Sequence, residues 1–148
     1  MAWAVRPGRA NLYPVSGRGL PSPGVHNSSD MGAESLLSDE DYCYLTTTGR
    51  VTGEPREIEI WFGVDGSRLY MLSGGRDRSD WVKNLMREPR VRVRIAGRTF
   101  DGTARIVSDP DEDARARALL FDKYSPGYSG DLDDWRKRSL PIAVDLHA

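Results

Sequence analysis

The chain has 148 residues, a length that suits one domain with a substantial core. Its composition, 39% hydrophobic and 29% charged, is typical of a globular protein, and a formal net charge of −1 argues against a nucleic-acid partner. A single cysteine, Cys43, excludes a disulfide within the chain and suits a cytoplasmic protein. No apolar run has the length of a membrane-spanning helix.

Residues 1–32 form a leader rich in Gly, Pro, Ser and Asn, without hydrophobic periodicity. The leader lacks the apolar stretch of a signal peptide, so we predict that it is disordered and place the folded domain at residues 33–148. Met31 is an alternative start, in which case the leader does not belong to the native protein. The competing interpretation is a tail that binds a partner or the membrane surface peripherally. Its contact residues would be Trp3, Arg6, Arg9 and Arg18.

The first half of the domain contains three predicted strands. A helical turn is expected over residues 33–41, and residues 42–47 are aromatic and β-branched, as strands prefer. Residues 56–64 alternate acidic and apolar side chains, which is the period of a half-buried strand. The Asp-Gly-Ser turn that follows accepts positive φ and predicts a hairpin into a third strand over residues 68–73.

The middle of the domain contains a helix and two more strands. Ser79 is a good N-cap and Pro89 stops a helix, so we predict a helix between them. Residues 90–95 read RVRVRI, a perfect alternation that predicts a strand. A short Ala-Gly-Arg turn then leads into a fifth strand over residues 99–107.

The last third contains two helices and the final strand. Asp109 as cap, Pro110 in the first turn and Glu112 three residues after the cap predict a helix that runs to about residue 124. A short helix over residues 132–138 and a sixth strand over 142–146 follow. Strands joined by hairpins imply an antiparallel sheet, and six such strands favour closure into a small barrel. The predicted fold class is mainly β with helices.

The first candidate site is the loop between the first two strands. Thr48, Gly49 and Arg50 bring a hydroxyl, a glycine that allows close approach and a guanidinium to one strand end, and Arg56 follows shortly after. Backbone N–H groups and arginine donors suit an anion, such as a cofactor phosphate. The alternative is an ordinary hairpin loop with solvated arginines.

The second candidate site is a strand that runs through Gly74 and Gly75 into the N-terminus of the first long helix. Such a junction offers free N–H groups and the positive end of a helix dipole, and Arg76 and Arg78 add charged donors. The alternative is a flexible connector. Neither site matches the Walker or the Rossmann glycine motif.

Aromatic and amide residues complete the set of candidates. Trp81 and Asn84 lie on the predicted helix, and Tyr124 and Tyr128 bracket a Ser-Pro-Gly break between two later helices. Each has an ordinary alternative role in packing or on the surface. The chain has no metal-ligand spacing and no Ser-His-acid triad in its predicted elements, which suggests that a bound cofactor performs the chemistry.

Five segments together resemble the deazaflavin-dependent nitroreductases, which belong to the split β-barrel superfamily that includes pyridoxamine 5′-phosphate oxidase. The segments are LTTTGRVTGEPR, LYMLSGG, DWVKNLMREPRVRVRIAGRTFDGTARIV, KYSPGY and RSLPIAVDL. The resemblance implies a six-stranded antiparallel split β-barrel with flanking helices. It also implies an oxidoreductase in which the reduced coenzyme F-420 passes a hydride to a small-molecule electron acceptor: a quinone, a nitro compound or an activated alkene.

The resemblance also assigns roles to residues. The phosphate and polyglutamate tail of the coenzyme would be held by Thr48, Gly49, Arg50 and Arg56. The deazaflavin ring would lie against Leu72, Ser73 and Gly74, with Gly75 next to them. The pocket would be supported from the helix by Trp81 and Asn84. The acceptor side would be lined by Tyr124 and Tyr128, one of which would donate a proton to the reduced acceptor.

The chain departs from the family pattern near the tail site. It has Val51 and Gly74 where the family commonly has basic residues, and Glu57 and Glu59 where it has small or polar ones. Arg76 and Arg78 would supply compensating charge. Two alternatives therefore remain: an FMN-binding flavoprotein of the pyridoxamine-oxidase type, and a non-enzymatic split barrel that binds a cofactor or hydrophobic ligand. The chain would be a monomer or a homodimer.

Overall fold

The computed structural model describes residues 5–7, 37 and 39–147. In chain order, the strands and helices of this part are β1 (Val5–Pro7), β2 (Cys43–Thr48), β3 (Pro55–Ile60), β4 (Gly63–Asp65), β5 (Arg68–Ser73), η2 (Arg76–Arg78), α2 (Asp80–Arg87), β6 (Arg90–Ile95), β7 (Arg98–Ile106), α3 (Pro110–Tyr124), η3 (Ser125–Gly127), α4 (Asp133–Arg138) and β8 (Leu140–Leu146).

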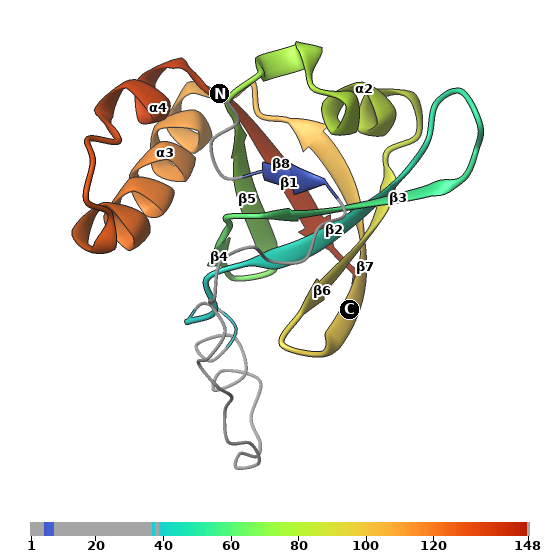
Figure 1. Cartoon of the computed structure of the whole chain (residues 1–148), viewed down its shortest axis with the longest axis horizontal. Helices are drawn as coiled ribbons and strands as arrows, with labels where there is room; N and C mark the ends of the chain where they lie inside the picture. Colours follow the sequence, from blue (N-terminus) through green and yellow to red (C-terminus); the bar gives the residue numbers. More distant parts are fainter. Residues whose placement is uncertain (1–4, 8–36, 38, 148) are drawn as a thin grey trace.

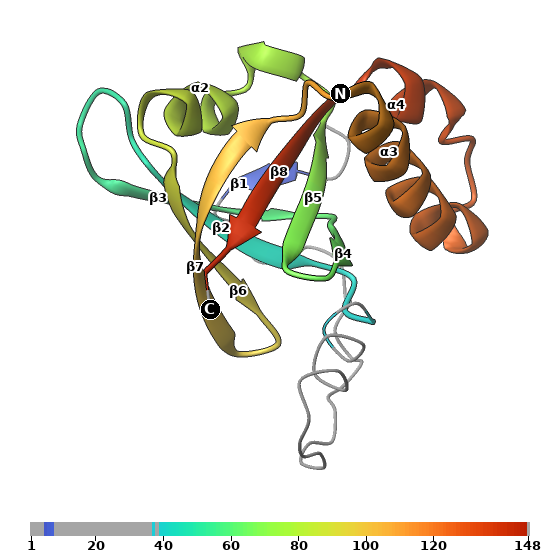
Figure 2. The same ribbon diagram turned by 180° about the vertical axis from the view of Figure 1, so that it is seen from behind.

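The strands form one antiparallel sheet that curls into a half-open barrel (Figures 1 and 2). The strand order is β1-β3-β2-β6-β7-β8-β5-β4, and the ladder between β6 and β7 runs from Arg90 opposite Thr103 to Ile95 opposite Arg98. Helix α2 lies beside the β2–β3 hairpin, whereas α3 and α4 pack together at the other side of the barrel. The predicted fold class, a mainly β split barrel with flanking helices, is confirmed.

The strand predicted over residues 56–64 is two strands, β3 and β4, separated by Trp61 and Phe62. At the break, the backbone N–H of Phe62 donates to the hydroxyl of Tyr124 at 3.0 Å, and Lys123 Nζ donates to the Phe62 carbonyl at 2.9 Å. Side chains of α3 therefore satisfy backbone groups that a sheet partner would otherwise satisfy. After this break, the chain no longer pairs with β2, and β4 pairs with β5 at the other edge of the sheet.

The leader contributes one described element. Val5–Pro7 forms β1, which pairs antiparallel with the edge of β3. Val5 lies opposite Ile60, and Pro7 lies opposite Ile58. The rest of the segment predicted to be disordered lies outside the described residues, and so does most of the expected turn at 33–41. The division into a leader and a domain therefore stays a prediction.

Alternating side chains of the strands fill the barrel and form one core. The arginines of β6 are exposed while Val91, Val93 and Ile95 are buried, as the perfect alternation predicts. Helix α2 closes one end of the barrel with Trp81 and Leu85. A second cluster lies under α3 and α4 and includes Leu120, Leu132 and Trp135.

A charged network joins α3 to the outer face of the sheet. Arg105 donates from Nη1 and Nη2 to the two carboxylate oxygens of Glu112, both at 2.9 Å, and from Nε to Asp145 at 2.8 Å. The hydroxyl of Tyr70 donates to Glu112 at 2.7 Å. These donors, Arg105 first, lower the pKa of Glu112 to about 2.

We expect Glu112→Gln to remove part of the acid sensitivity of the fold. Because the folded pKa is depressed, the stabilisation from Glu112 is present above its unfolded value of 4.5 and is lost as pH falls toward about 2. The variant should be less stable than the parent at pH 7 by about 1–2 kcal/mol, with a smaller difference at pH 3. Urea unfolding at both pH values measures this, and Asp122→Asn on the exposed side of α3 is the control. A deficit that is equal at both pH values would contradict the linkage.

Candidate functional site

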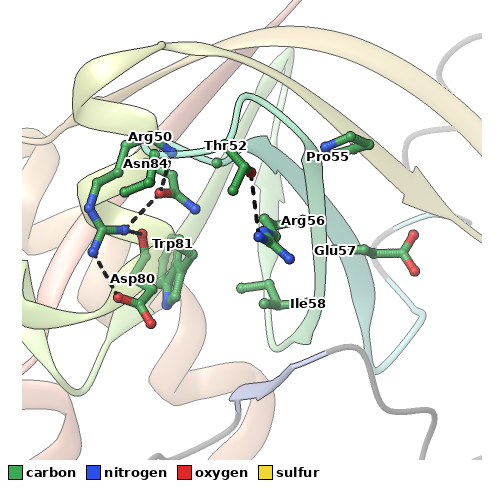
Figure 3. A pocket seen from close by; sticks show the side chains of 11 residues that line it. Arg50, Thr52, Pro55, Arg56, Glu57, Ile58, Asp80, Trp81 and Asn84 are labelled. Atoms are coloured by element: carbon green, nitrogen blue, oxygen red, sulfur yellow. Dashed lines mark hydrogen bonds and ion pairs between the residues drawn. The ribbon is translucent and has the colours of Figure 1, made fainter.

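A pocket of about 590 Å³ lies between the β2–β3 hairpin loop and helix α2 (Figure 3). The hairpin ends with β3 at Ile60 and the helix begins at Asp80, so the pocket exists only because α2 packs beside the loop. It is lined by Gly49, Arg50, Val51, Thr52, Pro55, Arg56, Glu57, Ile58, Asp80, Trp81 and Asn84.

The hairpin loop holds its shape through its own backbone. The N–H of Gly49 donates to the Glu54 carbonyl and that of Gly53 donates to the Gly49 carbonyl, both at 2.8 Å. Gly53 has a φ of 77°, which favours glycine. A Cβ at Gly49 would lie 3.0 Å from the Thr52 hydroxyl and 3.1 Å from the Glu54 carbonyl oxygen, so a larger residue there would make the loop shift by a few tenths of an ångström.

Asn84 joins the loop to the helix and the sheet. Its side chain is 4% exposed. Its Oδ1 accepts from the backbone N of Arg50 at 3.1 Å and from Nη1 of Arg50 at 2.8 Å, and its Nδ2 donates to the hydroxyl of Thr47 at 3.2 Å. The amides of Gly49 and Arg50, expected to face an anion, are therefore already bonded within the protein. Charge for an anion comes from the side chains instead.

Two arginines line the pocket, and their guanidinium groups have different partners. Arg50 makes an ion pair with Asp80 at 3.1 Å, whereas Arg56 donates to the hydroxyl of Thr52 at 3.4 Å. Within the described part of the chain, Arg56 has no carboxylate partner. The carboxylate of Glu57 points away from the cavity in Figure 3 and pairs with Arg94 at 3.1 Å.

One wall of the pocket is the indole of Trp81, which is 5% exposed. Its Nε1 is buried and has no hydrogen-bond partner among the described residues. A buried donor without an acceptor costs about 1–3 kcal/mol, so this N–H opposes the stability that burial of the indole provides. Ile58 of β3 adds an apolar surface on the facing side (Figure 3).

The family of the chain follows from a comparison over most of its length. The model of the F420H(2)-dependent quinone reductase family matches residues 25–147. The chain belongs to this family. The family name refers to the reduced form of coenzyme F-420, and the resemblance seen in the sequence is thereby confirmed.

Solved structures share the fold of this quinone-reductase family member. A conserved hypothetical protein from Mycobacterium tuberculosis is 19% identical, with 82% of each chain covered and a TM-score of 0.67. An F420 reductase is 22% identical over 78% of this chain and 93% of that one, with a TM-score of 0.57. A putative pyridoxamine 5′-phosphate oxidase from Listeria innocua is 17% identical over 80% and 93%, with a TM-score of 0.60.

In this member of the quinone reductase family, the second predicted site does not reach the pocket. Leu72 and Ser73 are buried, and the Ser73 hydroxyl donates to the Arg76 carbonyl at 2.9 Å and meets that of Ser79 at 3.0 Å. Ser79 holds the N-cap position of α2 without a side-chain capping bond. The residues of this junction that do not line the pocket are Leu72, Ser73, Gly74, Gly75, Arg76 and Arg78.

Thr48 and Arg76 make contacts outside the pocket. Thr48 lines a separate groove on the far side of the hairpin, beside Arg90 and Arg92. Arg76 donates to the carbonyl of Arg138 at the end of α4. The pocket thus brings together Gly49, Arg50, Arg56, Trp81 and Asn84 from the sequence-based set, and adds Asp80 and Ile58, which that set does not contain.

Tyr124 and Tyr128 belong to an aromatic cluster at α3, not to the pocket. Tyr124 stacks on Trp61 with ring centroids 4.2 Å apart, and Tyr128 meets the same indole edge-on at 5.8 Å. The Tyr124 hydroxyl accepts from Phe62 N and lies 2.7 Å from the Asp41 carbonyl, to which it donates. Burial raises its pKa well above the usual value of 10, which keeps the phenol protonated.

We expect Tyr124→Phe to act on stability rather than on reduction. The change removes the acceptor for Phe62 N and a donor to the Asp41 carbonyl, so the free energy of unfolding should fall by about 1–3 kcal/mol. Thermal unfolding measures the loss, and steady-state reduction of an acceptor measures the effect on chemistry. Tyr128→Phe is the companion variant. A large loss of turnover with unchanged stability would instead assign Tyr124 to catalysis.

No helix in the described part of the chain is long and apolar enough to cross a membrane.

Proposed function

We propose that the chain uses reduced coenzyme F-420 to reduce a small acceptor: a quinone, a nitro compound or an activated alkene. The observation that carries the proposal is the pair of guanidiniums, Arg50 and Arg56, at a pocket whose wall is the indole of Trp81. Family membership supports an F-420-dependent oxidoreductase in general. The acceptor class is the part that belongs to the proposal.

The donor set of the pocket fits the chemistry of the coenzyme. Its phosphate and glutamate carboxylates are anions, for which guanidinium donors give strong, charge-assisted hydrogen bonds. Its ring is planar and largely apolar, which suits a pocket with an indole as one wall. When bound, the reduced coenzyme supplies a hydride to the acceptor. The protein supplies position and exclusion of water.

Each pocket residue then has a proposed role. Arg56, with no carboxylate partner among the described residues, is the first contact for the phosphate. Gly49 allows the tight loop that places Arg50 and Arg56 at one cavity. Asn84 holds the direction of Arg50, and Trp81 orients the ring. The exposed Val51 stands where the family commonly has a cation, so the arginines carry the charge of the site.

A binding titration tests the proposal directly. Oxidised F-420 added to the full-length protein should quench tryptophan emission with a dissociation constant in the range of about 1 μM to 1 mM. The quenching should be lost in Trp81→Phe, because the other described indoles, Trp61 and Trp135, pack in the aromatic cluster at α3. Absence of quenching across that range in the parent protein would refute the proposal.

The same titration with FMN separates the alternative cofactor. Neighbouring structures include a putative pyridoxamine 5′-phosphate oxidase, so a flavin is the natural competitor. If the proposal is correct, FMN should neither quench Trp81 as strongly as F-420 nor displace it at equal concentration. A purified protein that is yellow and saturates with FMN in preference to F-420 would favour the flavoprotein instead.

A further inference from the structure

We propose that Asp80 is an internal counterion of Arg50, which a coenzyme anion must displace, and that Asp80 thereby sets the affinity and anion selectivity of the pocket. This inference rests on the proposed function. It begins from the ion pair between Arg50 Nη2 and Asp80 Oδ1 at 3.1 Å, which lies at the cavity (Figure 3). The pair places a carboxylate where an external anion would otherwise bind.

The carboxylate of Asp80 is not needed to aim Arg50. Asn84 Oδ1 already accepts from both the backbone N and Nη1 of Arg50, at 3.1 and 2.8 Å. The backbone carbonyl of Asp80 accepts from Nη1 at 3.4 Å, and any residue at that position would provide it. Two contacts at Nη1 and one at the backbone N therefore hold Arg50 without the carboxylate, which leaves the carboxylate the role of neutralising the charge of the guanidinium.

The ion pair between Arg50 and Asp80 is exposed enough for an external anion to replace the Asp80 carboxylate. The side chain of Asp80 is 84% exposed and that of Arg50 is 32% exposed. Ion pairs in such exposed positions are weak, because water screens them and holding them costs side-chain entropy. An incoming phosphate or carboxylate can therefore replace Asp80 at Arg50, while Arg56 provides a cation without a competing carboxylate among the described residues.

A selectivity follows from this arrangement. A ligand without anionic groups gains nothing at Arg50, because the guanidinium already has its partner. A ligand with a phosphate and several carboxylates engages Arg56 first and then competes with Asp80 at high local concentration. The counterion therefore favours polyanionic ligands over neutral ones of the same ring system.

The test is Asp80→Asn in the full-length protein, with Asp77→Asn as the matched control. Asp77 is an exposed acid in the turn η2, three residues before Asp80, and does not line the pocket. Both variants lose one negative charge, but only Asp80→Asn removes the partner of Arg50. We expect Asp80→Asn to tighten F-420 binding about threefold to tenfold in low salt, with a smaller gain at 0.5 M salt, since salt screens the interaction. Asp77→Asn should change the affinity less than twofold.

A second ligand isolates the charge effect. The deazaflavin nucleoside without phosphate or glutamates should bind the parent and Asp80→Asn equally. If Asp80→Asn weakens F-420 binding, leaves it unchanged, or tightens the neutral nucleoside to the same extent, the inference is wrong while the proposed function stands. If neither the parent nor either variant binds F-420, the proposed function and the inference both fall.

Discussion

Asn84→Leu should lower the affinity for F-420 about tenfold or more. The leucine has nearly the same volume, but it removes the acceptor that holds the backbone and guanidinium of Arg50 and the donor to the Thr47 hydroxyl. Without these bonds, coenzyme binding must also order the Arg50 side chain and its loop, and each immobilised flexible side chain costs about 0.5–1.5 kcal/mol in addition to the cost of ordering the loop. The titration of Trp81 emission measures the affinity.

The same variant should also be less stable. The Thr47 hydroxyl is buried and would lose its partner, and the hairpin loop would lose its bond to α2. We expect the free energy of unfolding to fall by about 2–4 kcal/mol, which thermal unfolding would detect. Met86→Leu, a volume-conserving change at an exposed position on the same helix, is the control and should alter neither quantity.

A double-mutant cycle separates the two effects. If Asn84 acts on the coenzyme by holding Arg50, then Arg50→Met and Asn84→Leu should not be additive in binding energy. The double variant should bind about as weakly as Arg50→Met alone. Full additivity would show that Asn84 affects the coenzyme independently of Arg50, and the positioning role assigned to it would be wrong.

The strands could be predicted from the sequence wherever polar and apolar residues alternate, because such alternation indicates that one face of the strand is buried. RVRVRI became β6 because every second side chain points into the barrel, a constraint that is visible within six residues. The break at Trp61 and Phe62 was not predictable, since its cause is a hydroxyl and an ammonium group on α3, about sixty residues later. Local periodicity contains no information about such distant side chains.

In the candidate site, too, some residues could be predicted from local sequence, whereas others depend on contacts between distant segments. Glycine and arginine in the hairpin, and Trp81 and Asn84 on the helix, could be singled out because their chemistry suits an anion and a planar ring. Asp80 could not be singled out in the same way, since its pairing with Arg50 depends on how α2 packs beside the loop. The sequence places Tyr124 and Tyr128 at a break between helices, but it does not show that the Tyr124 hydroxyl is bonded to the backbone of Phe62 and Asp41.

Gly102→Ala should destabilise the barrel by about 1–3 kcal/mol, a typical cost of overpacking. Gly102 lies in β7, opposite Val91 of β6 on one side and Leu146 of β8 on the other. A Cβ there would lie 2.6 Å from Val144 Cγ1 and 2.9 Å from the Asp145 carbonyl oxygen, so a backbone atom would have to move.

The matched control is the same substitution at Gly127, where a new Cβ meets nothing within 4 Å and φ is not positive. Gly127→Ala should be neutral or stabilising by up to about 1 kcal/mol, because alanine restricts the unfolded chain. Both variants have equal effects of that kind on the unfolded state, so the difference between them in thermal unfolding isolates the close approach of β8 to β7. Equal melting temperatures would mean that β8 can move away from the new Cβ without loss of stability. The position opposite Leu146 would then not require glycine.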